Sequence, residues 1–187
     1  MLYILGNIKS HSPSLFATAG MGSQYCIKIY IMEQIQTLDT FRQYHGGYFK
    51  TLLSPFQTGG TMAIMDMTLP QGAEPPLHLH TLEDETFYLL EGRILFRVGD
   101  ENILAKEGDT VFAIRNIPHD FKIISEYARF ITIISPGDFW HYFMEFSNSC
   151  KGEPSIIPPQ GPPSSGELAK LISRLADRYG LRFVREV

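Results

Sequence analysis

Two histidines and a glutamate lie close together in a stretch of the chain that has the turn residues and apolar runs of β-structure. In an extended strand the side chains of His78 and His80 point to the same face, so both imidazoles can approach one ion. Residues 81–84 are polar enough to form a turn, after which Glu85 could return to the same ion from a neighbouring strand. His119 opens another β-type run and offers a fourth ligand. This spacing predicts a metal site.

The segment resembles the first motif of the cupin superfamily. That motif is a Gly, five residues, His-x-His, four residues, a Glu, six residues and a Gly, and its fixed positions are all filled here, by Gly72, His78, His80, Glu85 and Gly92.

The second cupin motif is matched more loosely. Gly108 and His119 are in place and a proline precedes the histidine, but Ile114, Asn116 and Ile123 stand where the family often has Pro, Gly and Asn. Asn116 is a mild departure, because Asn tolerates positive φ better than most residues.

The resemblance covers about residues 40–146 and implies an all-β fold, the cupin double-stranded β-helix or jelly-roll barrel. It implies a metal bound inside the barrel by His78, His80, Glu85 and His119. Three imidazoles and one carboxylate suit a divalent transition metal, namely Fe, Mn, Ni, Co, Cu or Zn, and the sequence does not choose among them.

Alternation along the strands predicts which side chains line the barrel. Counting from Glu85 and from His119, Phe87, Leu89, Phe121 and Ile123 face inward and make an apolar, aromatic substrate pocket. The alternative is that they are core residues filling a small barrel. No further cofactor-binding motif is expected.

The residues next to the motif have a simpler interpretation. We expect Glu83 and Asp84 to lie in a solvated turn, with the alternative that either replaces Glu85 as a ligand. We assign no role to His11, His45 and His141.

The β-type runs are separated by Gly, Pro, Asn and Asp punctuation, as in a sandwich or barrel. The expected strands are Tyr48–Phe56, Thr61–Leu69, Thr86–Leu90, Arg93–Val98, Thr110–Ile114, His119–Ile124 and Ala128–Ile134.

Residues 32–150 are therefore predicted to form the barrel domain. Residues 1–31 are interpreted as a disordered or mis-annotated extension, with Met32 as the favoured start; the alternatives are a weak export signal or an edge strand at 26–31. Residues 151–187 are predicted to be a Pro-rich linker followed by a helix that packs on the barrel.

The helix has its own signals. Ser164 and Glu167 form a capping-box pattern, Leu168, Leu171, Ile172 and Leu175 recur at helical spacing, and Gly180 is placed to end the helix in the left-handed conformation.

A second part of the resemblance lies after the last expected strand. A Ser-Pro-Gly turn at 135–137, an aromatic helix that would cover one barrel end, a Pro-rich linker and a helix ending at Tyr179-Gly180 are similar to the quercetin 2,3-dioxygenase-like proteins. This similarity extends the match to about residues 32–184.

The resemblance implies a metal-dependent dioxygenase that acts with O₂ on an enolisable, flavonol-like aromatic small molecule, with Glu85 as the catalytic base. Two other functions stay open: a non-catalytic cupin that binds a metal or small molecule, and an O₂-independent metal-assisted isomerase or hydrolase.

Composition limits the partners and the compartment. The 187 residues carry 16 Lys+Arg against 20 Asp+Glu, a net charge of −4, which disfavours nucleic acid as a partner. There is no apolar run long enough to span a bilayer. Cys26 and Cys150 are interpreted as free thiols of a cytoplasmic protein, and proteins of this kind usually form homodimers.

Overall fold

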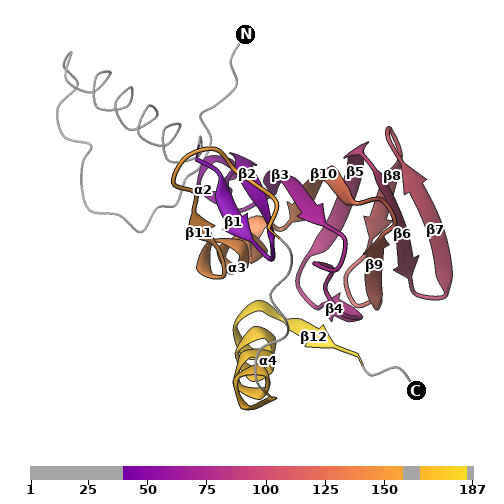
Figure 1. Ribbon diagram of the computed structural model, residues 1–187. Helices are drawn as coiled ribbons and strands as arrows, with labels where there is room; N and C mark the ends of the chain where they lie inside the picture. Colours follow the sequence, from indigo (N-terminus) through magenta and orange to yellow (C-terminus); the bar gives the residue numbers. More distant parts are fainter. Residues whose placement is uncertain (1–39, 158–164, 185–187) are drawn as a thin grey trace, which may run out of the picture. The chain divides into compact units, whose positions relative to one another are not determined.

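The computed structural model describes residues 40–157 and 165–184, with the side chains of residues 165–171 left out (Figure 1). The predicted extension at 1–31 and the capping residue Ser164 lie outside the described residues.

Twelve described strands form two antiparallel sheets. The seven-stranded sheet has the order β11-β1-β2-β3-β10-β5-β8. Its strands are β1 (Arg42–Tyr44), β2 (Gly47–Leu53), β3 (Ala63–Pro70), β5 (Asp84–Glu91), β8 (Thr110–Ala113), β10 (Tyr127–Ser135) and β11 (Asn148–Ser149). The five-stranded sheet has the order β12-β4-β9-β6-β7. Its strands are β4 (His78–His80), β6 (Arg93–Val98), β7 (Glu101–Lys106), β9 (His119–Ile123) and β12 (Leu181–Phe183). The all-β cupin double-stranded β-helix predicted from the sequence is confirmed.

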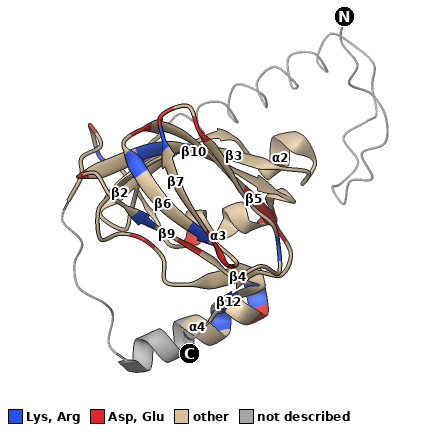
Figure 2. Ribbon diagram, turned by 90° about the vertical axis from the view of Figure 1, so that its right-hand side faces the viewer, with Lys and Arg blue, Asp and Glu red and all other residues tan. Residues whose placement is uncertain are grey.

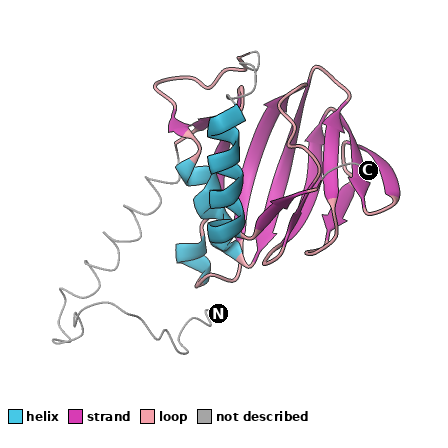
Figure 3. Cartoon of the chain, turned by 90° about the horizontal axis from the view of Figure 1, so that it is seen from below, coloured by secondary structure: helices cyan, strands magenta, loops and turns pink. Residues whose placement is uncertain are grey.

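The helices are short and gather at one side of the strands (Figure 3). They are α2 (Pro55–Thr58), the 3-10 helix η1 (Gly137–Phe139), α3 (Trp140–Glu145) and α4 (Ser165–Tyr179). Gly180 ends α4 with φ +63°, as predicted. The described helices include none that is both long and apolar enough to cross a membrane.

An aromatic cluster joins the two sheets inside the barrel. Phe87 and Phe130 come from the seven-stranded sheet, and Phe96 and Phe121 from the five-stranded sheet. Their ring centroids lie 5.1 to 6.1 Å apart, a spacing at which aromatic pairs attract one another. All four side chains are at most 7% exposed.

The aromatic segment after β10 is helical, as expected, and it packs into the barrel. Trp140 and Phe143 are buried, and the indole Nε1–H of Trp140 donates to Thr51 Oγ1 at 2.9 Å. Glu145 of α3 also binds α4, since it accepts from Tyr179 at 2.5 Å and pairs with Arg174 and Arg178.

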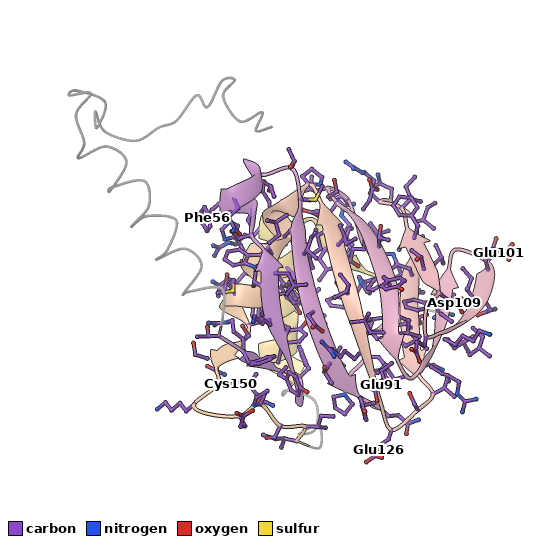
Figure 4. The ribbon with its side chains drawn as sticks, turned by 90° about the horizontal axis from the view of Figure 1, so that it is seen from above. Phe56, Glu91, Glu101, Asp109, Glu126 and Cys150 are labelled. Carbon is purple, nitrogen blue, oxygen red and sulfur yellow. The ribbon has the colours of Figure 1, made fainter. Side chains whose placement is uncertain are left out.

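Several predicted strand bounds differ from the observed ones, and the largest difference is at the end of the strand predicted at Tyr48–Phe56. Phe56 belongs to α2 instead of a strand, because Pro55 begins a helical turn and Gln57 Oε1 accepts the backbone N–H of Ser54 at 2.9 Å. Gly59 closes this turn with φ +64°. Phe56 is 64% exposed and lies at the edge of the molecule (Figure 4).

The sequence analysis missed strands β1, β7, β11 and β12. Strand β7, which begins at Glu101 (Figure 4), buries only Ala105, so it has no apolar alternation to detect. Strands β1, β11 and β12 are two or three residues long, too short for a periodic pattern to show.

Two glycines with the same backbone conformation allow the effect of crowding to be tested. Gly92 has φ +89° and Gly108 φ +88°, but a Cβ at Gly92 would lie 2.6 Å from Tyr127 O, whereas nothing lies within 4 Å of one at Gly108. We expect Gly108→Ala to lower the free energy of unfolding by about 1–2 kcal/mol through backbone conformation alone. Gly92→Ala should lower it further, because the carbonyl of β10 must move. Thermal unfolding of both variants measures the difference, at roughly 2–4 °C per kcal/mol for a chain of this size. Equal shifts in the two variants would contradict this prediction.

Candidate metal centre

The structure brings together the four side chains predicted as ligands. Each of these residues offers one possible ligand atom, and the four atoms all lie within 4.8 Å of one another. The residues are His78, His80, Glu85 and His119. All four residues are buried, with exposed fractions between 1% and 6%. They are the one such group of three or more His, Cys, Asp or Glu residues within the described part of the chain.

The register of the sheets explains why these side chains meet. His78 of β4 pairs directly with His119 of β9, and His80 follows on the same face of β4. Glu85 comes from β5 in the other sheet and faces the histidines across the barrel. The centre is therefore built from both sheets.

Strand β4 is held on both sides. Besides its contact with β9, it pairs with β12, where Leu181 lies opposite His80 and Phe183 opposite His78. Hydrogen bonds extend this ladder, from Thr81 N to Gly180 O at 3.1 Å and from Val184 N to Leu77 O at 2.9 Å. Figure 1 shows β12 beside β4.

The turn before His119 is held against strands β4 and β5 by Asn116 and Arg115. Asn116 has φ +64°, the left-handed conformation for which Asn is the best substitute for Gly, and its N–H donates to His80 O at 2.7 Å. The neighbouring Arg115 binds both carboxylate oxygens of Asp84, at 3.0 and 2.6 Å, which anchors the start of β5 next to Glu85. This ion pair lowers the pKa of Asp84.

Glu85 is the acceptor at the middle of the group. Its Oε2 lies 3.4 Å from the Nε2 atoms of both His80 and His119. Burial raises the pKa of Glu85, but the neighbouring His80 and His119 outweigh burial and lower it below its usual range. Glu85 is therefore a carboxylate.

The histidines differ in their protonation. Burial, together with repulsion from His119 and His80, lowers the pKa of His78 to about 4. Burial also lowers the pKa of His80, but Glu85 and then Glu83 attract its proton and raise the pKa to about 9.

The donor set fits a transition metal. Bonds of about 2.1 Å to imidazole and carboxylate ligands place neighbouring ligand atoms about 3–4 Å apart, which agrees with the 3.4 Å from Glu85 to each of two histidines. His78 Nδ1 and His119 Nδ1 approach backbone carbonyls, so the Nε2 atoms remain free for the centre. His78, His80, Glu85 and His119 would hold the ion.

Aromatic rings surround the histidines. The ring of Phe139 meets that of His80 edge-on at 4.3 Å, and Tyr142 stacks on Phe139 at 4.8 Å. The hydroxyl groups of Tyr142 and Tyr44 lie 3.0 Å apart, and burial raises the pKa of both phenols.

The four predicted pocket residues all point inward. Phe87, Leu89, Phe121 and Ile123 are between 1% and 7% exposed and belong to the hydrophobic core. Phe87 and Phe121 each lie two residues beyond a ligand on the same strand face, so they adjoin the centre. That they bind a substrate stays a prediction.

The interpretation of Glu83 was wrong. Instead of lying in a solvated turn it is 3% exposed, and its Oε2 lies 3.7 Å from His80 Nδ1. Asp84 is the first residue of β5 and binds Arg115. The polar sequence Thr-Leu-Glu-Asp carries no sign that one of its two acids turns inward.

The described surface carries charges of both signs (Figure 2). Basic and acidic residues are interspersed along the barrel strands (Figure 2), and several of them form ion pairs with one another, such as Arg97 with Asp120 and Arg129 with Asp66. Cys150 is a free cysteine, as predicted, while Cys26 lies outside the described residues.

Comparison with known proteins gives relatives for this part of the chain. Quercetin 2,3-dioxygenase of Bacillus subtilis (strain 168) is 26% identical over 103 residues, which are 55% of this chain and 31% of that protein. An uncharacterized protein of Methanocaldococcus jannaschii is 31% identical over 80 residues, 42% of this chain and 64% of that protein. The matched region thus spans less than two thirds of each of these curated relatives.

Solved structures also match. A predicted oxalate decarboxylase from Thermotoga maritima aligns with a TM-score of 0.47 at 23% identity, covering 52% of this chain and 93% of that one.

The family comparison covers the centre itself. Residues 65–141 match the cupin domain, and this range includes all four clustered side chains. The protein therefore contains a cupin domain of the cupin superfamily, with distant homology to quercetin 2,3-dioxygenase.

Proposed function

We propose that the protein is a metal-dependent dioxygenase that acts with O₂ on an enolisable aromatic small molecule of flavonol type. The observation that carries the proposal is the buried group of three imidazoles and one carboxylate, in which Glu85 Oε2 lies 3.4 Å from two histidine nitrogens. The distant homology to a protein named quercetin 2,3-dioxygenase supports the substrate class.

The ion would supply Lewis acidity and a place where the substrate oxygen and O₂ can react. The chain's own contribution is proton transfer and orientation. Glu85 is the one carboxylate of the four ligands, so it is the group among them that would accept the proton of an enol hydroxyl.

The surroundings suit a flat apolar substrate. The ring of Phe139 lies against His80 and carries Tyr142 stacked on it. Phe87 and Phe121 follow two residues after Glu85 and His119 on the same strand faces. Because the ligands are at most 6% exposed, water is largely excluded from them. The predicted homodimer and cytoplasmic location stay predictions.

The first test is the metal content of the purified protein. We expect close to one transition-metal ion per chain, measured by elemental analysis, and its loss in His80→Ala with the barrel still folded by circular dichroism. His141→Ala is the control, since His141 contacts Phe56 and Trp140 and lies outside the cluster. An absence of metal after reconstitution of the unsubstituted protein would contradict the proposal.

The second test addresses Glu85 as a base. Glu85→Gln keeps an oxygen at the same position but removes the basic group, so O₂ uptake with a flavonol should fall by about 10²–10⁴-fold. The control is Glu126→Gln, which neutralises an exposed glutamate at the rim of the barrel (Figure 4). An oxygen electrode gives the rate.

The outcome also separates the alternative functions. Turnover that persists without O₂ would favour the isomerase or hydrolase. A fully metallated protein that consumes no O₂ across a broad panel of enolisable aromatics would favour the non-catalytic binding protein.

A further inference from the structure

The three histidines of the centre are held in different ways at their outward-facing nitrogens. His78 Nδ1 lies 2.8 Å from Pro76 O, and His119 Nδ1 lies 3.0 Å from Ile117 O. A carbonyl can only accept, so each of these Nδ1 atoms carries the proton and donates it. The backbone two residues earlier therefore orients both rings.

His80 has no such backbone acceptor. His78 and His119 each open a strand after a turn, where a preceding carbonyl is free to face the ring. His80 is the last residue of β4, and in an extended strand the carbonyls point into the sheet ladder. Accordingly, His80 Nδ1 is buried without a hydrogen-bond partner.

Glu83 faces that nitrogen. Its Oε2 is also buried without a hydrogen-bond partner, and the two atoms lie 3.7 Å apart. His80 is 1% exposed and Glu83 3% exposed. A buried carboxylate is costly unless it is paired, and the atom that it faces, His80 Nδ1, is the one fully buried imidazole nitrogen of the centre that has no hydrogen-bond partner.

We propose that Glu83 is a positioning residue, which accepts a hydrogen bond from Nδ1–H of His80 and thereby holds Nε2 of His80 toward the metal. The inference rests on the proposed metal site and names a residue beyond its four ligands. Ligating histidines usually donate their second N–H to a carboxylate, carbonyl or water. Here two backbone carbonyls and one carboxylate would accept the second N–H groups of the three histidines.

The negative charge of Glu83 would also help to balance the charge of a bound metal ion. Glu85 brings one negative charge to the centre, and Glu83 brings a second one a single imidazole ring away. Two buried carboxylates balance a divalent cation, whereas Glu85 alone would leave a net positive charge in a dry interior.

The test compares variants that keep or remove the acceptor. Glu83→Leu removes it, and Glu83→Gln keeps an amide oxygen without the charge. Glu126→Leu is the matched control, because it makes the same change at an exposed glutamate outside the cluster. Zn²⁺ affinity is measured by competition with a chromophoric chelator, and the visible spectrum of the Co²⁺-loaded proteins reports the ligand geometry.

We expect Glu83→Leu to bind Zn²⁺ about 10–100-fold more weakly, with a changed Co²⁺ spectrum. Glu83→Gln should recover part of this loss, and Glu126→Leu should match the unsubstituted protein. Metal-free Glu83→Leu should remain folded by circular dichroism, because the hydrophobic core of the two sheets does not depend on this acceptor.

Three results would overturn the assignment: affinities of both Glu83 variants within about twofold of the unsubstituted protein, an equal loss in Glu126→Leu, or a metal-free Glu83→Leu that is unfolded. Failure of the proposed function can be distinguished from failure of the Glu83 assignment. If the unsubstituted protein binds no ion, the metal site itself is refuted, whereas a lack of O₂ uptake leaves the assignment of Glu83 intact.

Discussion

The constraint on which this structure depends is the burial of polar groups in an apolar barrel. Three imidazoles and a carboxylate are at most 6% exposed, and each loses its hydration on folding. The fold compensates by setting them against one another and against fixed acceptors: Glu85 faces two histidines, and Pro76 and Ile117 supply carbonyls to His78 and His119. Of the three buried side-chain atoms in the described residues that have no hydrogen-bond partner, two face each other at this centre, His80 Nδ1 and Glu83 Oε2.

To bring the ligands together, the strands that carry them must pair in a fixed register, and several short strands and loops fix it. Strand β4 has three residues, and alone it could not hold two ligands in place. It is fixed because β9 pairs with it on one side and β12, about 100 residues further along the chain, pairs with it on the other. Asn116 and Arg115 then attach the loop before β9 to β4 and β5. Segments distant in sequence therefore meet around the ligands.

This explains what the sequence could predict. Motif spacing and two-residue alternation are local properties of the sequence. They were therefore enough to predict the main strands, the helix end at Gly180 and the four clustered residues His78, His80, Glu85 and His119. Glu83 could not, because its inward direction depends on how the turn between β4 and β5 packs. The pairing of β12 with β4 was also out of reach, since three residues carry no period and the partner is remote.

The clustered residues and the aromatic residues near them come from different parts of the fold. The four clustered residues come from strands β4, β5 and β9, which belong to the two cupin motifs. The aromatic groups at the site come partly from elsewhere: Tyr44 lies on β1, Phe139 on η1 and Tyr142 on α3. The hydroxyls of Tyr44 and Tyr142 stay protonated because burial raises their pKa values, and the charge of Glu85 raises them further. In the proposed function, the motif strands would fix the proton acceptor and the ligands, while β1, η1 and α3 would shape the space that a substrate must enter.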